Sequence, residues 1–167
     1  QKIKNYKYKP KDFILADAKD GDLAMGVTTP GPQRDSQGNI IQGFKKLKDY
    51  KNALESLDVS DTQHLFSEDA TIFENGKFEG SYQDYLDNHI GPELGHFREF
   101  TFNDYEVHIR LEGEIAISFE TYIYKIILNG ENPRIVERQG TATSVLKNFD
   151  GNWKIIQNHG SSREIRN

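Results

Sequence analysis

Two histidines and one carboxylate occupy positions from which they could share a polar site. Alternation along the predicted strand 153–159 places His159 on the same face as Trp153, at the end of an apolar row. His89 belongs to the apolar stripe of a predicted helix, and Glu74 ends a short predicted strand. We therefore predict that these three side chains point into one cavity.

This trio would suit two kinds of chemistry. Two imidazoles and a carboxylate from separate elements can hold a divalent transition metal and leave positions open for water or substrate. His96, seven residues after His89, is a candidate fourth ligand or a gate at the opening. Without a metal, Glu74 or a histidine could accept a proton while a neighbour stabilises the charge. A hydrogen-bonded core histidine would also fit the position of His89, so the alternatives stay open.

Three helices are predicted upstream of the last strands. A spacing of three and four residues predicts the first helix, through Phe44, Leu47, Tyr50, Lys51, Leu54 and Leu57. Ser60 with Gln63 resembles a capping box that opens a second helix through Phe66. Ser81 with Asp84 opens a third helix, which Gly91-Pro92 ends.

Long strands dominate the chain after about residue 98. Turn signals at Leu111-Glu-Gly113, Asn129-Gly130 and Asp150-Gly151 separate four of them, which predicts an antiparallel meander. Strands of this length twist and curl, and the helices are the available filling for the concave face. The fold class is therefore α+β, a curved antiparallel sheet enclosing three N-terminal helices.

The predicted strand around residue 120 has two unlike faces. The more apolar one is predicted to point inward and comprises Ile115, Ile117, Phe119, Thr121 and Ile123. Glu120, Tyr122 and Tyr124 would then lie on the outer face, where tyrosines could pack against a second subunit. His108 is likewise expected to face away from the core, and His64 to be solvated at a helix end.

The chain divides into a loop-rich extension and one domain. Glycines and prolines interrupt every pattern in residues 1–43, where only residues 13–16 read as a buried patch and residues 28–39 read as loop. Residues 44–167 form the predicted domain, which is large enough for a continuous core. The extension could be a lid, a dimer arm or a tether.

Composition narrows the function classes. The net charge of -5, from 21 basic and 26 acidic residues, argues against nucleic acid as the partner. No run approaches the roughly 20 apolar residues of a membrane span, and the absence of cysteine excludes disulfides and thiolate ligands. The first residue is Gln1, which indicates a shortened chain or an exported protein after signal removal; a cytoplasmic location stays open.

The chain resembles the nuclear transport factor 2-like superfamily, and within it the SnoaL-like group. The resemblance covers roughly residues 44–165 and rests on the segments His64-Leu-Phe-Ser-Glu-Asp-Ala-Thr-Ile-Phe-Glu74, Gly80-Ser-Tyr-Gln-Asp-Tyr-Leu86, Gly140-Thr141, Gly151-Asn-Trp153-Lys-Ile-Ile156 with His159, and Ser161-Ser-Arg163. It implies a cone-shaped fold, often paired as a homodimer through the convex sheet. Some relatives carry a histidine where this chain has Gln157, and an amide there is a poorer metal ligand.

Three functions follow from this interpretation. The first is binding of a small-molecule ligand or a metal ion, in a cavity lined by Phe73, Tyr85, Thr121, Thr141, Trp153 and Gln157. The second is an isomerase or lyase type of enzyme that uses Glu74, His89 and His159 for proton transfer. The third is a dimerisation module with a vestigial pocket, since this scaffold hosts unrelated functions. The sequence does not decide whether the protein is an enzyme.

Overall fold

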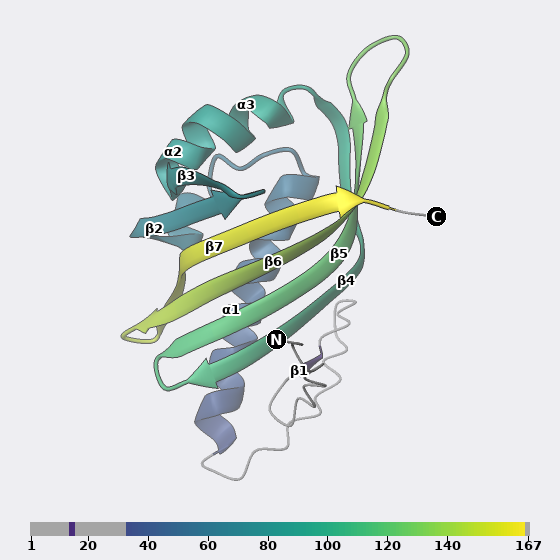
Figure 1. The fold of residues 1–167 in the computed structure, drawn as a ribbon. Helices are drawn as coiled ribbons and strands as arrows, with labels where there is room; N and C mark the ends of the chain where they lie inside the picture. Colours follow the sequence, from purple (N-terminus) through teal and green to yellow (C-terminus); the bar gives the residue numbers. More distant parts are fainter. Residues whose placement is uncertain (1–13, 16–32, 166–167) are drawn as a thin grey trace, which may run out of the picture.

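One long helix and one curved sheet make up most of the computed structural model, which describes residues 14–15 and 33–165 (Figure 1). The helical segments are α1 (Gln33–Glu55), η1 (Gln63–Leu65), α2 (Tyr82–Tyr85), η2 (Leu86–Ile90) and α3 (Gly91–Leu94). The strands are β1 (Ile14–Leu15), β2 (Phe66–Glu74), β3 (Lys77–Ser81), β4 (Phe97–Glu112), β5 (Ile115–Leu128), β6 (Ile135–Phe149) and β7 (Asn152–Glu164). None of the described helices is long and apolar enough to cross a membrane.

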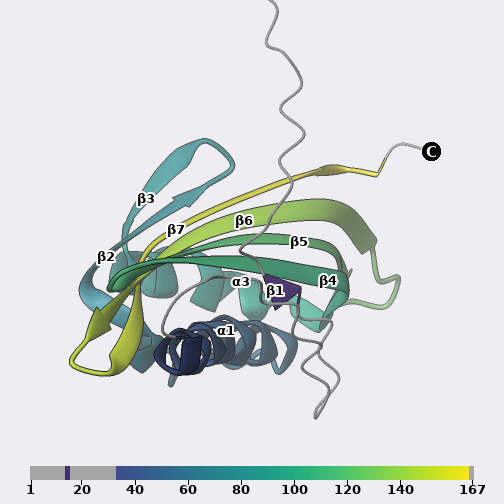
Figure 2. The ribbon, with the colours of Figure 1, turned by 90° about the horizontal axis from the view of Figure 1, so that it is seen from below.

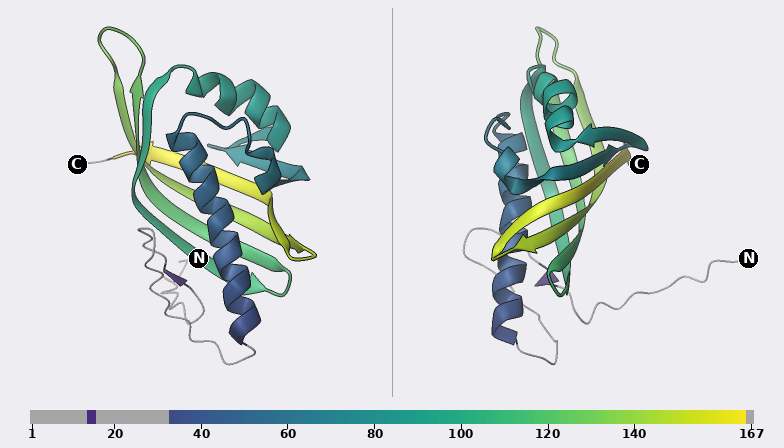
Figure 3. Two further views of the ribbon diagram at one scale, coloured as in Figure 1. Left: turned by 180° about the vertical axis from the view of Figure 1, so that it is seen from behind. Right: turned by 90° about the vertical axis from the view of Figure 1, so that its left-hand side faces the viewer.

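The sheet has the strand order β1-β4-β5-β6-β7-β2-β3. Strands β4 to β7 form the predicted antiparallel meander. Strand β2 pairs with β7 in parallel, so the sheet is mixed and the purely antiparallel prediction is wrong. The strands curve without closing into a barrel, and the helices lie against the concave face (Figures 2 and 3).

Helix α1 begins at Gln33, so the loop predicted for residues 28–39 is wrong from residue 33 onward. Its buried residues follow the predicted spacing, with Leu47, Tyr50, Lys51 and Leu54 on one face. This face packs across β4 and β7. The division at residue 43 stays a prediction, and residues 1–13 and 16–32 lie outside the described residues.

Among the residues that the structure describes, two helical stretches, rather than three, lie against the sheet. The predicted second helix is only the single 3₁₀ turn η1, because Ser60 bonds back to Asp58 through both its amide and its hydroxyl instead of capping a helix. Segments α2, η2 and α3 follow one another without a break as the third predicted helix. The predicted end at Gly91-Pro92 is wrong, because Pro92 lies in the first turn of α3, where its missing N–H is tolerated, and the helix continues to Leu94. The capping box of Ser81 and Asp84 opens it as expected.

The faces of β5 are the reverse of the prediction. Ala116, Ser118 and Glu120 are buried on the concave side, and Phe119 is 45% exposed on the convex side. Apolar alternation misled here because helix α1 approaches this part of the sheet and carries a charged partner for Glu120. Tyr122 and Tyr124 therefore also face inward, and the predicted tyrosine-bearing outer face does not exist.

Candidate functional site

A cavity of about 130 Å³ lies between α1, the second helical stretch and the concave face of the sheet. Its wall is mostly aromatic. The rings that line it are Tyr50, Phe73, Tyr85, Phe97, Phe100, Phe102, Tyr122 and Tyr124. Phe73 and Tyr85 thus line the cavity, as the sequence predicted. Charged side chains occur at two separate places in this mostly aromatic wall.

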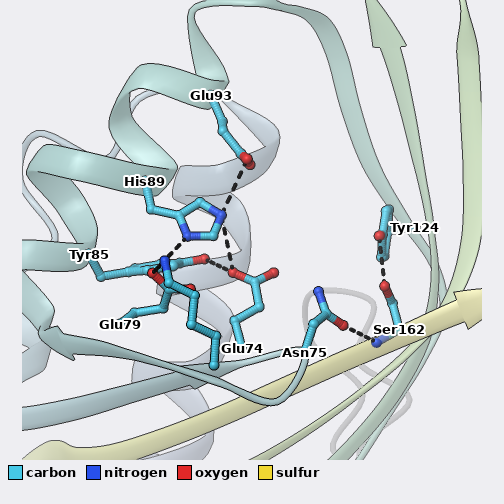
Figure 4. Close-up of polar contacts among 9 residues, drawn as sticks. Glu74, Asn75, Glu79, Tyr85, His89, Glu93, Tyr124 and Ser162 are labelled. Atoms are coloured by element: carbon cyan, nitrogen blue, oxygen red, sulfur yellow. Dashed lines mark hydrogen bonds and ion pairs between the residues drawn. The ribbon is translucent and has the colours of Figure 1, made fainter.

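The first charged group lies around Glu74 at the end of β2 (Figure 4). The hydroxyl of Tyr85 donates a hydrogen bond of 2.8 Å to Oε2 of Glu74, and Nε2 of His89 lies 3.6 Å from the same oxygen. The side chains of Glu74 and His89 are 32% and 24% exposed, so this group is within reach of solvent. Burial, together with the negative groups nearby, raises the pKa of Tyr85 well above its ordinary value.

His89 is in contact with two further carboxylates. Its Nδ1 lies 3.2 Å from Oε2 of Glu79, and its Nε2 lies 3.3 Å from Oε1 of Glu93. The hydrogen bond from Lys77, and then the contact with His89, lower the pKa of Glu79. With a carboxylate near each ring nitrogen, the imidazole is held in a fixed orientation beside Glu74.

Local backbone features place this group. Residues 86–90 form the π-helical turn η2, a form that often occurs at functional sites. It depends on Gly91, where a Cβ atom would overlap the carbonyl oxygen of Leu86. On the other side, the tight turn after Glu74 is tied to β7, because Asn75 accepts a 2.9 Å hydrogen bond from the amide of Ser162.

The second charged group is buried and was missed by the sequence interpretation. Nζ of Lys51, which lines the cavity, lies 3.5 Å from Oε2 of Glu120, and the two side chains are only 9% and 1% exposed. The hydroxyl of Tyr105 donates a 2.7 Å hydrogen bond to the same oxygen. A lysine within the apolar stripe of α1 was the available signal, since a buried lysine requires a partner.

Aromatic rings surround the ammonium group of Lys51. Its Nζ lies 4.7 Å from the ring centroid of Tyr122, 5.1 Å from that of Phe102 and 5.8 Å from that of Tyr50. Burial alone would lower the pKa of Lys51, but Glu120 and then Tyr122 raise it above the usual value. Lys51 is therefore a cation at neutral pH.

His159 does not join Glu74 and His89. Pairing of β6 with β7 shifts between Ile155 and Gln157, which makes Ile156 an extra residue and reverses the faces of the strand beyond it. Asn158 consequently lines the cavity, whereas Gln157 and His159 are exposed on the convex side. The prediction of one site for all three polar groups is therefore wrong, and only Glu74 and His89 meet.

Other predicted site residues lie elsewhere. Thr121 and Thr141 pair with each other and are exposed on the convex face, because the faces of β5 and β6 are the reverse of those expected. Trp153 is fully buried in the core. His96 is exposed just beyond α3.

The geometry lends no support to the predicted metal ligands. Within residues 14–15 and 33–165, no group of three histidine, aspartate or glutamate side chains is arranged to hold a metal ion. Binding of a divalent transition metal stays a prediction of the sequence alone.

Comparison with known families agrees with this fold. A model of the SnoaL-like domain matches residues 45–163, which is most of the chain and includes both charged groups. The chain belongs to the SnoaL-like domain family. No curated protein matches this SnoaL-like chain.

Several solved structures are similar in fold to this SnoaL-like domain. A nuclear transport factor 2-like protein from Salmonella enterica serovar Typhimurium has a TM-score of 0.66 at 17% identity, covering 80% of this chain and 95% of its own. A candidate dehydratase of the nuclear transport factor 2-like family from Streptomyces avermitilis has a TM-score of 0.67 at 15% identity, covering 77% of this chain and 99% of its own. A candidate scytalone dehydratase from Novosphingobium aromaticivorans has a TM-score of 0.66 at 15% identity, with 78% and 93% covered. At such identities the likeness establishes the fold.

Proposed function

We propose that this SnoaL-like domain binds a small molecule about the size of one six-membered ring in its aromatic cavity. The volume of about 130 Å³ carries this proposal. An apolar protein cavity of roughly 150 Å³ is known to hold benzene, so a single ring fits in this volume. Stacked and edge-on contacts with the lining rings would supply most of the affinity.

Glu74 gives this cavity a hydrogen-bond acceptor near solvent. Its Oε2 accepts from Tyr85, and a carboxylate offers about four acceptor sites in all. A ligand hydroxyl or amine could therefore donate to Glu74. Phenol, a single ring with one hydroxyl, is the simplest probe of this arrangement.

Titration calorimetry and ligand-observed NMR with phenol would test the binding proposal. Ala142 lines the cavity from β6, so Ala142→Leu should fill the space and abolish binding. Thr143→Leu adds similar bulk one residue along, on the opposite face of the strand, and should leave binding intact. Equal binding by both variants and the parent, or no binding by the parent, would refute the proposal.

Proton transfer is a second candidate function, because Glu74 and Tyr85 line the cavity and are hydrogen-bonded, and His89 contacts Glu74 beside it. In such a reaction the Glu74 carboxylate would take a proton from a carbon beside a carbonyl group, and His89 would exchange it with solvent. Exchange of the α-hydrogens of cyclohexanone for deuterium would report this step. This function requires that Glu74→Gln abolishes exchange and that Glu68→Gln, at an exposed position of the same strand outside the cavity lining, does not.

We also propose a homodimer through the convex face of the sheet, formed by other residues than those expected from the sequence. The residues on this face of β5 are Ile115, Ile117, Phe119, Thr121 and Ile123, which is a more apolar row than the tyrosines expected from the sequence. Such a face on a curved sheet suits self-complementary pairing of two copies.

A further inference from the structure

The buried ammonium group of Lys51 has hydrogen-bond donors at the cavity wall that Glu120 does not use. An ammonium group carries three N–H donors, and Glu120 supplies one acceptor at 3.5 Å. Lys51 lines the cavity, and the three rings nearest its Nζ offer their faces rather than strong acceptors. An oxygen atom of a bound molecule would be a far better partner for the remaining donors.

The two charged groups at the cavity wall differ in their exposure. The Lys51 side chain is 9% exposed and that of Glu74 is 32% exposed, so the part of the wall at Lys51 is the more enclosed one, here called the enclosed end, and Glu74 lies nearer solvent. Both belong to the wall of the same space. A ligand that spans the space can therefore accept a hydrogen bond at one end and donate one at the other.

Charge selects further among such ligands. Glu120 already balances the charge of Lys51, so an anionic ligand would gain little there and would pass Glu74 and Glu93, both of which line the cavity. A cationic ligand would meet the ammonium group at the enclosed end. A neutral molecule avoids both repulsions and the cost of burying a net charge.

We propose that Lys51, held by Glu120, is the specificity-determining anchor of this cavity and selects neutral single-ring compounds with an oxygen acceptor at one end and a hydroxyl donor at the other. This inference rests on the proposed binding of a single ring in the cavity. The ligand oxygen accepts a hydrogen bond from Nζ of Lys51, and the ligand hydroxyl donates to Glu74. Tyr105, which also bonds to Glu120, acts as a positioning residue for this anchor.

A matched pair of probes would test the anchor. 4-Hydroxyacetophenone and 4-ethylphenol have nearly the same shape, but only the first has an oxygen for Lys51. Because hydrogen bonds to charged groups are among the stronger ones, we expect the ketone to bind about tenfold more tightly to the parent protein. 4-Hydroxybenzoate, which adds a negative charge at the same end, should bind more weakly than the ketone.

Variants of Lys51 and Glu120 would show whether this residue pair causes the preference for the ketone. Since Lys51→Met alone leaves Glu120 buried without its cation, the double variant Lys51→Met with Glu120→Gln guards against loss of folding. It should keep 4-ethylphenol binding and lose the tenfold preference. Lys45→Met, at an exposed position of α1 outside the cavity lining, should keep the preference.

The possible outcomes separate the two proposals. If the parent binds both phenols with equal affinity, or if the double variant retains the preference, the anchor is refuted while single-ring binding stands. Tighter binding of 4-hydroxybenzoate than of the ketone would refute the selection of neutral ligands. If neither phenol binds to the parent, the proposed function fails and the anchor fails with it.

Discussion

The ring of Tyr122 lies directly over Gly140 on the neighbouring strand. The two residues are paired across β5 and β6, and a Cβ atom added at Gly140 would overlap three atoms of the ring. Glycine therefore lets this ring lie flat on the sheet, where its centroid is 4.7 Å from Nζ of Lys51. The backbone of one strand thus sets the wall of the cavity beside its buried cation.

Gly140→Ala should displace Tyr122 and destabilise the protein by about 1–3 kcal/mol, the usual cost of overpacking a filled interior. Urea unfolding would measure this change. Gly160→Ala is the matched control, because a Cβ atom there meets nothing within 4 Å. Two variants of equal stability would show that Tyr122 is free to move.

The pair of Lys51 and Glu120 should behave as one unit in stability measurements. Lys51→Met leaves a carboxylate that is 1% exposed without its cation, and breaking a buried pair in this way costs about 3–5 kcal/mol. Adding Glu120→Gln should recover most of the loss in the same unfolding experiment. If the pair were exposed and weak, the single and the double variant would instead have nearly the same free energy of unfolding as the parent.

Alkaline pH should unfold the protein cooperatively. Burial is the first cause that raises the pKa of Tyr50, Tyr85, Tyr105 and Tyr122, and it raises the pKa of Tyr82 to about 12. The folded state thus keeps protons that the unfolded chain gives up near pH 10, so this stability is present below about pH 10 and is lost as the pH rises.

Phenolate absorbance and circular dichroism, followed through the same titration, would check this expectation. The phenolate signal of these buried tyrosines should rise together with the loss of secondary structure. Complete phenolate formation in a protein with unchanged dichroism would contradict the burial of these rings.

A charge on the convex face should oppose the proposed dimer. Phe119 is 45% exposed in the apolar row of β5, and Phe119→Lys would place two like charges near each other across a self-complementary interface. Sedimentation analysis should then find a monomer, whereas Phe149→Lys, at the end of β6, should remain dimeric. A monomeric parent protein would remove the basis for the dimer.

Local sequence signals predicted the framework of the fold and half of the site. The capping box at Ser81, the Asp150-Gly151 turn and the buried spacing of α1 depend on near neighbours in the chain, and each is present. The tight turn predicted at Asn129-Gly130 is wrong, because residues 129–134 form a longer loop between β5 and β6. The face of each long strand was harder to predict. Alternation cannot register the extra residue Ile156, which turns His159 outward.

The sequence interpretation also lacked the contacts between residues far apart in the chain that stabilise a buried charge. Alternation put Glu120 outside because the other face of its strand, with Ile115, Ile117 and Phe119, is the more apolar one. Its partners Lys51 and Tyr105 come from other elements, and no local pattern connects them. The enclosed end of the cavity was therefore missed, although Lys51 in the apolar stripe of α1 indicated a buried partner, whereas the contact of Glu74 with His89 was predicted.

The central claim is that a single ring enters the concave cavity, and intermolecular nuclear Overhauser effects would test it most directly. In a complex with 4-hydroxyacetophenone, we predict contacts from the ligand ring to the methyl groups of Ala142 and Ile72, which line the cavity. Contacts to Thr143 and Val145 on the convex face, with none to Ala142 or Ile72, would contradict the account.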